Sequence, residues 1–199
     1  VPKLRFPEFA KVGEWNNLSL TQVCTEIAQG GTPDTTNSEF WNGLIEWLTP
    51  ADMGNLDNRF LSQTNRKITQ KGLENCSSPL LPIDSVIIST RAPIGHLIIN
   101  KKVMAMNQGC KGLIPKQTTS ADFLYYTLLK NKTKLVDLGA GNTFKELSGN
   151  ALKSFVTTYP SLPEQQKIAD CLSSLDDLIA AHKRKLDALG IAGLSEANF

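Results

Sequence analysis

Two apolar, strand-like runs in the middle of the chain are followed by polar side chains that could bind a partner. The runs are residues 86–88 (VII) and 97–99 (LII). The side chains near or beyond their ends are Thr90, Arg91, Asn107, Gln108 and Lys111. Guanidinium, ammonium and amide groups are hydrogen-bond donors, and no nucleophile and base stand together among them. The pattern indicates loops that contact something polar rather than loops that catalyse a reaction.

The chain shows none of the sequence patterns of several common enzyme classes. It has no glycine-rich nucleotide loop and no G-x-S-x-G elbow. It also lacks a carboxylate cluster for a metal-dependent nuclease and the loop and pocket motifs of an adenine methyltransferase. His96 and His182 have no local partner for a triad, and the four cysteines form no C-x-x-C pair. We therefore expect no catalytic residue, no metal site and no cofactor bound by this chain.

Length and composition favour one sizeable globular domain with an appended element. The 199 residues are 41% apolar and 20% charged, and the net charge of +2 is too small to indicate nucleic-acid binding by itself. Residues 41–118 are more basic, with nine basic against five acidic side chains, which permits a phosphate-facing surface. No apolar run reaches membrane-spanning length, and the N-terminus lacks the apolar region of a signal peptide. With reduced thiols, we expect a cytoplasmic protein.

The first 160 residues are interpreted as a mixed, strand-rich domain. The expected elements are an extended arm at 1–14, strands at 15–24, 44–48, 86–89 and 97–99, polar loops at 30–37 and 51–54, and a short helix at 64–74. A helix capped by Ser120 follows and is ended by Gly139 and Gly141, and a second helix is expected within 144–155. Trp41 and Trp47 are interpreted as core residues. The fold class is therefore α+β.

The clearest single element is a long helix over residues 163–189. Ser161-Leu162-Pro163-Glu164 has the arrangement of a capping box with proline in the first turn. An apolar seam with alternating spacings of four and three follows: Ile168, Leu172, Leu175, Ile179, His182, Leu186 and Leu189. Such a seam is typical of a coiled coil, and the helix would be about 40 Å long. We interpret it as a stalk that pairs with another helix. The alternative is that the seam packs against its own domain, and His182 is interpreted as a tolerated polar position.

Several blocks in a fixed order resemble the specificity subunit of type I restriction-modification systems. They are VPKLRFPEF at 1–9, GGTP at 30–33, FWNG at 40–43 followed by Ile45, Trp47, Thr49, Pro50, Asp52 and Met53, STRAPIG at 89–95, NQG at 107–109 and LPEQQKIA at 162–169. The resemblance covers about residues 1–189. It implies a target recognition domain at 1–160, a spacer and dimerisation helix at 161–190, and a tail at 191–199.

The resemblance also implies a role and partners. The chain would recognise a bipartite site in double-stranded DNA and direct a partner adenine-N6 methyltransferase (M) subunit there, and an ATP-dependent restriction (R) subunit could join. S-adenosylmethionine, ATP and Mg²⁺ would be used by those partners. The family has two recognition domains and two helices, whereas this sequence has one of each. It is interpreted as a truncated chain, an artificial fragment or a natural half-subunit, which would pair with a second copy or with a different half.

The same resemblance makes polar loop residues candidates for DNA contact. Arg91 would contact guanine or a phosphate, and Asn107 and Gln108 would contact adenine or hold loops together. The full set of candidates is Thr32, Thr49, Asp52, Arg59, Arg66, Lys71, Thr90, Arg91, Asn107, Gln108 and Lys111. Lys67 is a further phosphate candidate. Two other functions stay open: a free-standing dimeric DNA-binding regulator or methylase inhibitor, and an enzyme whose motif is not recognised.

Overall fold

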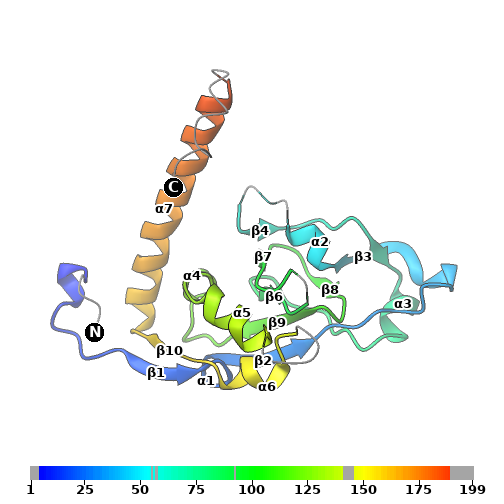
Figure 1. The fold of residues 1–199 in the computed structure, drawn as a ribbon, viewed down its shortest axis with the longest axis horizontal. Helices are drawn as coiled ribbons and strands as arrows, with labels where there is room; N and C mark the ends of the chain where they lie inside the picture. The colour runs from blue at the N-terminus through cyan, green and yellow to red at the C-terminus, as the bar shows by residue number, and fades with distance from the viewer. Residues whose placement is uncertain (1–4, 55, 57, 92, 141–145, 189–199) are drawn as a thin grey trace.

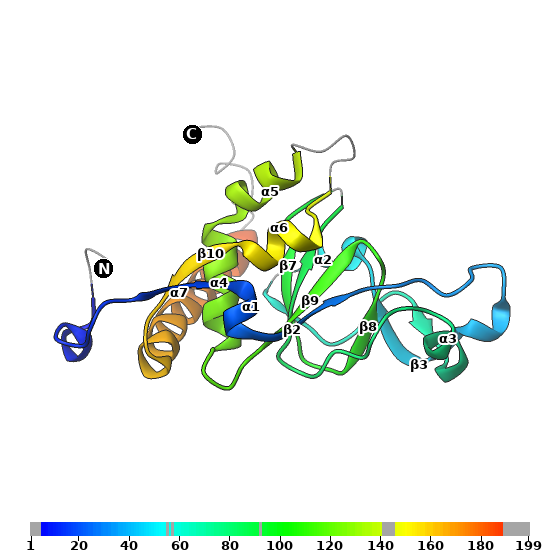
Figure 2. The same ribbon diagram turned by 90° about the horizontal axis from the view of Figure 1, so that it is seen from below.

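The computed structural model describes residues 5–54, 56, 58–91, 93–140 and 146–188. It shows a strand-rich body from which one long helix, α7, projects (Figure 1). The N-terminal arm runs along the side of α7 opposite to this body, as both views show (Figures 1 and 2). The α+β class expected from the sequence is confirmed.

A five-stranded sheet forms the centre of the body. Its order is β2 (Cys24–Gln29), β9 (Cys110–Pro115), β6 (Val86–Ser89), β7 (Leu97–Asn100) and β4 (Phe60–Leu61). All neighbours are antiparallel except the parallel pair β4 and β7. Every residue of β6 and β7 is buried, which explains why both read as continuous apolar runs. The strands expected at 86–89 and 97–99 are therefore confirmed.

A three-stranded sheet covers one face of the central sheet. It consists of β5 (Lys67–Ile68), β3 (Trp41–Leu48) and β8 (Met104–Met106), with β3 and β8 parallel. Met104 and Met106 pack with Ile87 and Ile98 of the central sheet. On the outer side, Trp41 and Trp47 join a small core of their own, as expected.

Two sequence-based assignments in this region were wrong. The expected helix at 64–74 is strand β5 followed by the short helix α3 (Gln70–Glu74), because the Thr69 hydroxyl accepts a hydrogen bond from the Gly72 amide and starts the helix there. The expected loop at 51–54 contains the helical turn α2 (Pro50–Met53). It is held by a capping box in which Asp52 accepts hydrogen bonds from the Thr49 amide and hydroxyl at 2.8 and 2.6 Å.

Three helices cover the other face of the central sheet: α4 (Ala121–Lys130), α5 (Lys132–Ala140) and α6 (Gly149–Ser154). Ser120 caps α4 as expected. The single helix predicted to run on to Gly139 divides instead at Asn131, whose backbone amide bonds the last carbonyls of α4. The helix predicted within 144–155 begins at Gly149, and Phe144 and Gly141 lie outside the described residues.

A two-stranded sheet connects the arm to the long helix. It pairs β1 (Asn16–Ser19) with β10 (Val156–Tyr159). The strand predicted at 15–24 was wrong in its second half, where α1 (Leu20–Val23) makes one helical turn inside a capping box between Ser19 and Gln22. The arm itself contains the short 3-10 helix η1 (Pro7–Phe9).

Helix α7 (Leu162–Ala188) confirms the long helix predicted from the heptad pattern. Its first turns pack on the body, where Ala169 is buried and Ile168 and Leu172 are partly buried against the main core. Beyond these turns its side chains are mostly exposed.

Candidate functional site

Polar side chains from three segments meet at the ends of strands β2 and β9. Lys111 Nζ donates a hydrogen bond to Gln29 Oε1, and Gln29 Nε2 donates to the Gln108 carbonyl at 3.1 Å. The Thr32 hydroxyl is hydrogen-bonded to the Gln108 side chain. We call Gln29, Thr32, Arg91, Gln108 and Lys111 the polar face. Arg91, which follows β6, also belongs to this face. A Cβ atom added to Gly109, the residue after Gln108, would lie 3.8 Å from the Arg91 Cβ.

Two glycines allow the loop after β2 to lie against the turn between β8 and β9. A Cβ atom on Gly30 would lie 1.9 Å from the Asn107 carbonyl oxygen, and one on Gly31 would lie 2.4 Å from Ser77 Oγ. The Gly31 amide donates to the Met106 carbonyl at 2.9 Å. These contacts leave no room for a side chain at either position, so the GGTP block positions Thr32 beside Gln108.

The polar face carries an unbalanced group of cations. Arg91 Nε lies 3.2 Å from Glu146 Oε2, and the Arg91 side chain is half exposed. Burial lowers the pKa of Lys111; the nearby Glu146 carboxylate raises it, whereas Arg91 and Lys153 lower it further. Among the described residues, the charged groups that act on Lys111 are the Glu146 carboxylate and the cations Arg91 and Lys153, so an anion placed here would be attracted.

Some residues that were predicted to contact DNA do not lie on the polar face. Their side chains hold the backbone of the loops beneath it. Thr90 is fully buried, and its amide and hydroxyl both donate to the Gly109 carbonyl, at 2.7 and 3.2 Å. Asn107 Oδ1 accepts from the Gly109 amide at 2.9 Å. Asp52 is buried and accepts from the Asn65 amide at 2.9 Å as well as from Thr49. Thr90 and Asp52, which were predicted from the sequence as candidates for DNA contact, are buried, and their side chains hold the backbone of the loops.

Other predicted residues lie on a different part of the molecule. Arg66 stacks over Trp41, with its guanidinium carbon 3.7 Å from the ring centroid. Lys71 forms an ion pair with Glu39 beside the outer sheet. Lys67 pairs with the buried Glu46 at 2.9 Å. These three cations belong to the surroundings of the three-stranded sheet and are not assembled with the polar face.

Arg59 connects the body to α7 instead of pointing to solvent. Its Nε lies 2.8 Å from Asp122 Oδ1, and its Nη2 donates to Ser173 Oγ at 2.8 Å. The guanidinium also stacks over the Phe60 ring at 4.2 Å. Only 9% of its side chain is exposed, so Arg59 fixes the angle of the helix and has little surface to offer a phosphate.

The start of α7 is anchored by the side chains of Glu164 and Gln165. Glu164 is buried, and its carboxylate accepts two hydrogen bonds from Arg5, each at 2.6 Å, and one from Trp15 Nε1 at 3.2 Å. The neighbouring Gln165 bonds the Ser120 amide and the Pro160 carbonyl at 3.0 Å each. The capping box predicted for Glu164 was wrong, since this carboxylate holds the N-terminal arm.

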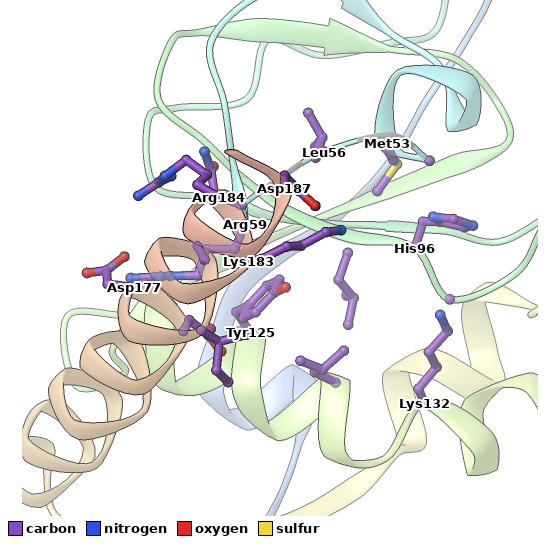
Figure 3. Close-up of a pocket in the computed structure, with 18 residues that line it drawn as sticks. Met53, Leu56, Arg59, His96, Tyr125, Lys132, Asp177, Lys183, Arg184 and Asp187 are labelled. Carbon is purple, nitrogen blue, oxygen red and sulfur yellow. The ribbon is translucent and has the colours of Figure 1, made fainter. Parts of the chain in front are cut away.

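The second half of α7 has an apolar seam that faces solvent. Leu175, Ile179 and Leu186 are 50%, 66% and 48% exposed. Beside the seam, a groove of about 620 Å³ separates α7 from the body. Figure 3 shows Lys183 and Asp187 of α7 on one side of this groove and Met53 and His96 of the body on the other. A long helix with exposed leucine and isoleucine side chains is expected to have a partner.

The described residues show neither a metal-binding group nor a membrane helix. Within them, no group of three or more His, Cys, Asp or Glu side chains could hold a metal ion. Among the same residues, no helix is both long and apolar enough to cross a membrane.

The strand-rich body with its long anchored helix is shared with solved structures of other proteins. The family described as the type I restriction modification DNA specificity domain matches residues 13–190. The chain therefore belongs to the type I restriction-modification specificity subunits, and it carries one target recognition domain.

Individual relatives agree with this assignment. The specificity subunit of the type I restriction enzyme MjaIX from Methanocaldococcus jannaschii is 42% identical over 179 residues, covering 88% of this chain and 41% of that protein. A chain from a structure described as showing complex assembly and conformational transition of the type I R-M system has a TM-score of 0.71 at 25% identity, covering 94% of this chain and 43% of that one.

A second solved structure has the same fold as this chain. The HsdS subunit from Thermoanaerobacter tengcongensis has a TM-score of 0.66 at 24% identity, covering 92% of this chain and 41% of that one. The chain thus spans about two fifths of the length of these relatives.

Proposed function

We propose that this chain recognises one half of a bipartite DNA site, that it pairs with a second copy through α7, and that it directs a partner adenine-N6 methyltransferase subunit to that site. The polar face carries the proposal. It combines exposed amides and a half-exposed arginine with a local excess of positive charge. Amides and arginines read base edges, and cations bind phosphates.

Within this face we assign different tasks to different residues. Arg91, Gln29 and Gln108 are the groups that contact DNA, because their side chains are exposed. Lys111 is buried and holds Gln29, so it positions an amide and adds positive charge beneath the surface. Thr90 and Asn107 hold the turn between β8 and β9, so they affect DNA binding through the shape of this turn.

The second copy supplies the other half-site. The exposed seam of α7 requires a covering helix, and two identical chains related by a twofold axis would read an inverted repeat. The methyltransferase subunit supplies S-adenosylmethionine and flips the target adenine. A restriction subunit that uses ATP and Mg²⁺ joins the same complex, and the whole assembly acts in the cytoplasm.

Selection from a random pool of DNA duplexes tests the recognition step. The purified chain, alone and with its methyltransferase subunit, is bound to the pool at moderate salt, and the retained duplexes are sequenced. We expect enrichment of a two-part sequence with inverted half-sites. The Arg91→Ala variant should lose this enrichment, while Lys71→Ala, which lies away from the polar face, should keep it. A retained pool with the composition of the input would contradict sequence-specific recognition.

A further inference from the structure

We infer that the polar face reads a guanine, and not an adenine, in the major groove, with Arg91 and the side-chain amide of Gln108 as the hydrogen-bond donors. This inference rests on the proposed function, because it names the base that the same face would read. The choice of base follows from the direction in which each polar group of the face points. Some ends of these groups are already bonded within the protein, and only the other ends are left for DNA.

Arg91 and Gln108 are neighbours at the end of two paired strands. The antiparallel pairing of β6 with β9 continues one step beyond the strands, where the Thr90 amide donates to the Gly109 carbonyl at 2.7 Å. The next residues along the two chains are Arg91 and Gln108, and both are exposed. A Cβ atom on Gly109 would lie 3.8 Å from the Arg91 Cβ, which shows how closely the two segments approach. The edge of one base can therefore contact both side chains.

Gln29 has a fixed orientation, because its bonding partners allow only one. Its Nε2 donates to the backbone carbonyls of Gly30 and Gln108, at 3.3 and 3.1 Å, and a carbonyl can only accept. Its Oε1 accepts from the ammonium of Lys111, which can only donate. Exchanging the two ends of the amide would place donor against donor and acceptor against acceptor. Gln29 therefore offers DNA an oxygen lone pair, since both of its amide hydrogens are directed at backbone carbonyls.

The side-chain amide of Gln108 presents its donor end instead. Its Oε1 accepts a hydrogen bond from the Thr32 hydroxyl, which the two glycines of the GGTP block place beside it. Its main-chain carbonyl is held by Gln29. Among the described residues, no group accepts a hydrogen bond from Gln108 Nε2, and the side chain is exposed. Gln108 therefore presents two N–H donors toward the surface, next to the guanidinium of Arg91.

Guanine is the base whose major-groove edge matches these donors. It presents two acceptors, N7 and O6, whereas adenine presents one acceptor and one donor, and thymine one acceptor beside a methyl group. Arg91 has only N–H donors, and the free end of Gln108 adds two more. An amide that reads adenine needs a free oxygen and a free nitrogen on the same side chain. Neither Gln29 nor Gln108 has both ends free.

The acceptors beside Arg91 suit the other base of the same pair. Glu146, whose side chain is 32% exposed, lies with its Oε2 3.2 Å from Arg91 Nε, and Gln29 adds its Oε1 lone pair. Such oxygens accept from the N4 amino group of cytosine. A G·C pair would therefore meet donors at its guanine and acceptors at its cytosine. An A·T pair would meet donors at the adenine amino group and acceptors at thymine O4, which is unfavourable on both sides.

A base analogue tests the guanine contact with the wild-type protein. The chain, together with its methyltransferase subunit, first selects its two-part sequence from the random duplex pool. Each guanine of the selected half-site is then replaced in turn by 7-deazaguanine, which keeps base pairing and O6 but carries C–H in place of N7. We expect one position at which the affinity, measured by fluorescence anisotropy, falls about tenfold. No loss at any guanine would overturn the inference.

Protein variants connect that position to the polar face. The readout is the preference, defined as the ratio of affinities for the selected duplex and for the same duplex with A·T at that position. Gln108→Glu keeps the oxygen that Thr32 bonds and places a second oxygen where Nε2 lies, so we expect the preference to fall about tenfold. Gln70→Glu is the matched control, because it adds the same charge on α3, away from the polar face, and should leave the preference unchanged.

Arg91→Lys separates base reading from phosphate binding. It keeps the positive charge but loses the planar fork that bonds two acceptors at once. We therefore expect the preference to fall about tenfold while the salt dependence of binding stays the same. An unchanged preference in Arg91→Lys, with equal affinity for all duplexes, would show a phosphate contact and overturn the inference.

The remaining outcomes distinguish this inference from the proposed function. A selected sequence in which the position affected by Gln108→Glu is an A·T pair would overturn the guanine contact. So would a Gln108→Glu variant with the preference of the wild type, because the free end of the amide would then be its oxygen. Both results leave recognition of a two-part site in place. A pool without any enriched sequence would overturn the proposed function and, with it, the guanine contact.

Discussion

Glu164 of α7 accepts two hydrogen bonds, each 2.6 Å long, from Arg5 of the N-terminal arm, 159 residues earlier in the chain. This pair connects the first and last described segments at the base of the helix. Trp15 adds a third hydrogen bond to the same carboxylate. The direction in which α7 leaves the body is therefore set by the arm as well as by the core.

Removing this carboxylate should destabilise the protein strongly. Glu164→Ala leaves the Arg5 guanidinium and the Trp15 indole without their acceptor in a buried site, which costs about 3 kcal/mol when a buried pair is broken. Urea unfolding followed by circular dichroism measures the change. Glu8→Ala is the control, because the ion pair between Glu8 and Lys167 is about half exposed, and this variant should change the unfolding midpoint little. Equal midpoints for both variants would contradict the anchoring role.

Glu46 should make the protein more sensitive to acid. Burial by itself raises the pKa of Glu46, but hydrogen bonds from Lys102, Lys67 and Thr64 outweigh it and lower the pKa from 4.5 to about 2. Because the folded pKa is the lower one, the stabilisation is complete above pH 4.5 and is lost as the pH falls toward 2. We expect a loss on the order of 2 kcal/mol, allowing for the half-exposed lysines.

The matched variant for this prediction is Glu46→Gln. It keeps the size of the side chain and removes the titration, so its unfolding free energy should depend less on pH between 4.5 and 2. Urea titrations at several pH values measure the difference from the wild type. An identical pH dependence in both proteins would show that Glu46 does not carry the effect.

Gly30 should not accept even a methyl group. A Cβ atom there would lie 1.9 Å from the Asn107 carbonyl oxygen, so Gly30→Ala must displace the turn between β8 and β9. We expect a loss of about 1–3 kcal/mol, as for other overpacked sites, together with weaker DNA binding because Gln108 moves. Gly13→Ala is the control, since nothing lies within 4 Å of its Cβ position. Unchanged stability of Gly30→Ala would contradict the close approach.

Arg91 and Glu146 should have opposite effects on DNA affinity. Arg91→Ala removes a side chain that we propose to contact DNA directly, and it should cost about 1–3 kcal/mol of binding free energy. Glu146→Gln removes the carboxylate that pairs with Arg91, so affinity for unrelated duplexes should rise. Fluorescence anisotropy over a range of salt concentrations measures both. If Arg91 binds a phosphate, its loss also reduces the salt dependence; unchanged affinity would remove Arg91 from the interface.

Charges in the exposed seam should separate the dimer. Leu175→Asp and Ile179→Asp each place a carboxylate in an apolar layer, and we expect the monomer at concentrations where the wild type is dimeric. Ile83→Asp, a change at an apolar residue of the body that is 53% exposed, controls for added surface charge. Sedimentation equilibrium distinguishes the states. A dimer of Ile179→Asp as stable as the wild type would rule out pairing through α7.

The sequence predicted elements whose pattern is set by burial. The sequences of strands β6 and β7 are continuously apolar because both faces of these strands are covered. The sequence of α7 has a heptad pattern because one stripe along the helix is apolar. Short elements were missed where one local hydrogen bond decides the conformation. The turn of helix at α1 follows from Ser19 and Gln22, and the break after α4 follows from Asn131.

The roles of single charged residues were harder to predict than the elements. In the sequence, Arg59 and Arg91 have similar surroundings, since each follows two polar residues and precedes apolar ones. Arg59 is buried against Ser173, 114 residues later, whereas Arg91 stays half exposed. Only the tertiary arrangement distinguishes a cation that holds a helix from one that faces solvent. Gln29 was missed because a lone glutamine at a strand end gives no signal until Lys111 is placed beside it.

Mapping of adenine methylation in living cells tests the central claim most directly. The chain is co-expressed with its methyltransferase subunit in a host that lacks adenine methylation, and the genome is sequenced with single-molecule detection of modified bases. Two identical chains paired by α7 predict methylation at a palindromic, two-part motif with half-sites about one helical turn apart. An asymmetric two-part motif, or a stable complex that methylates no site, would contradict this account.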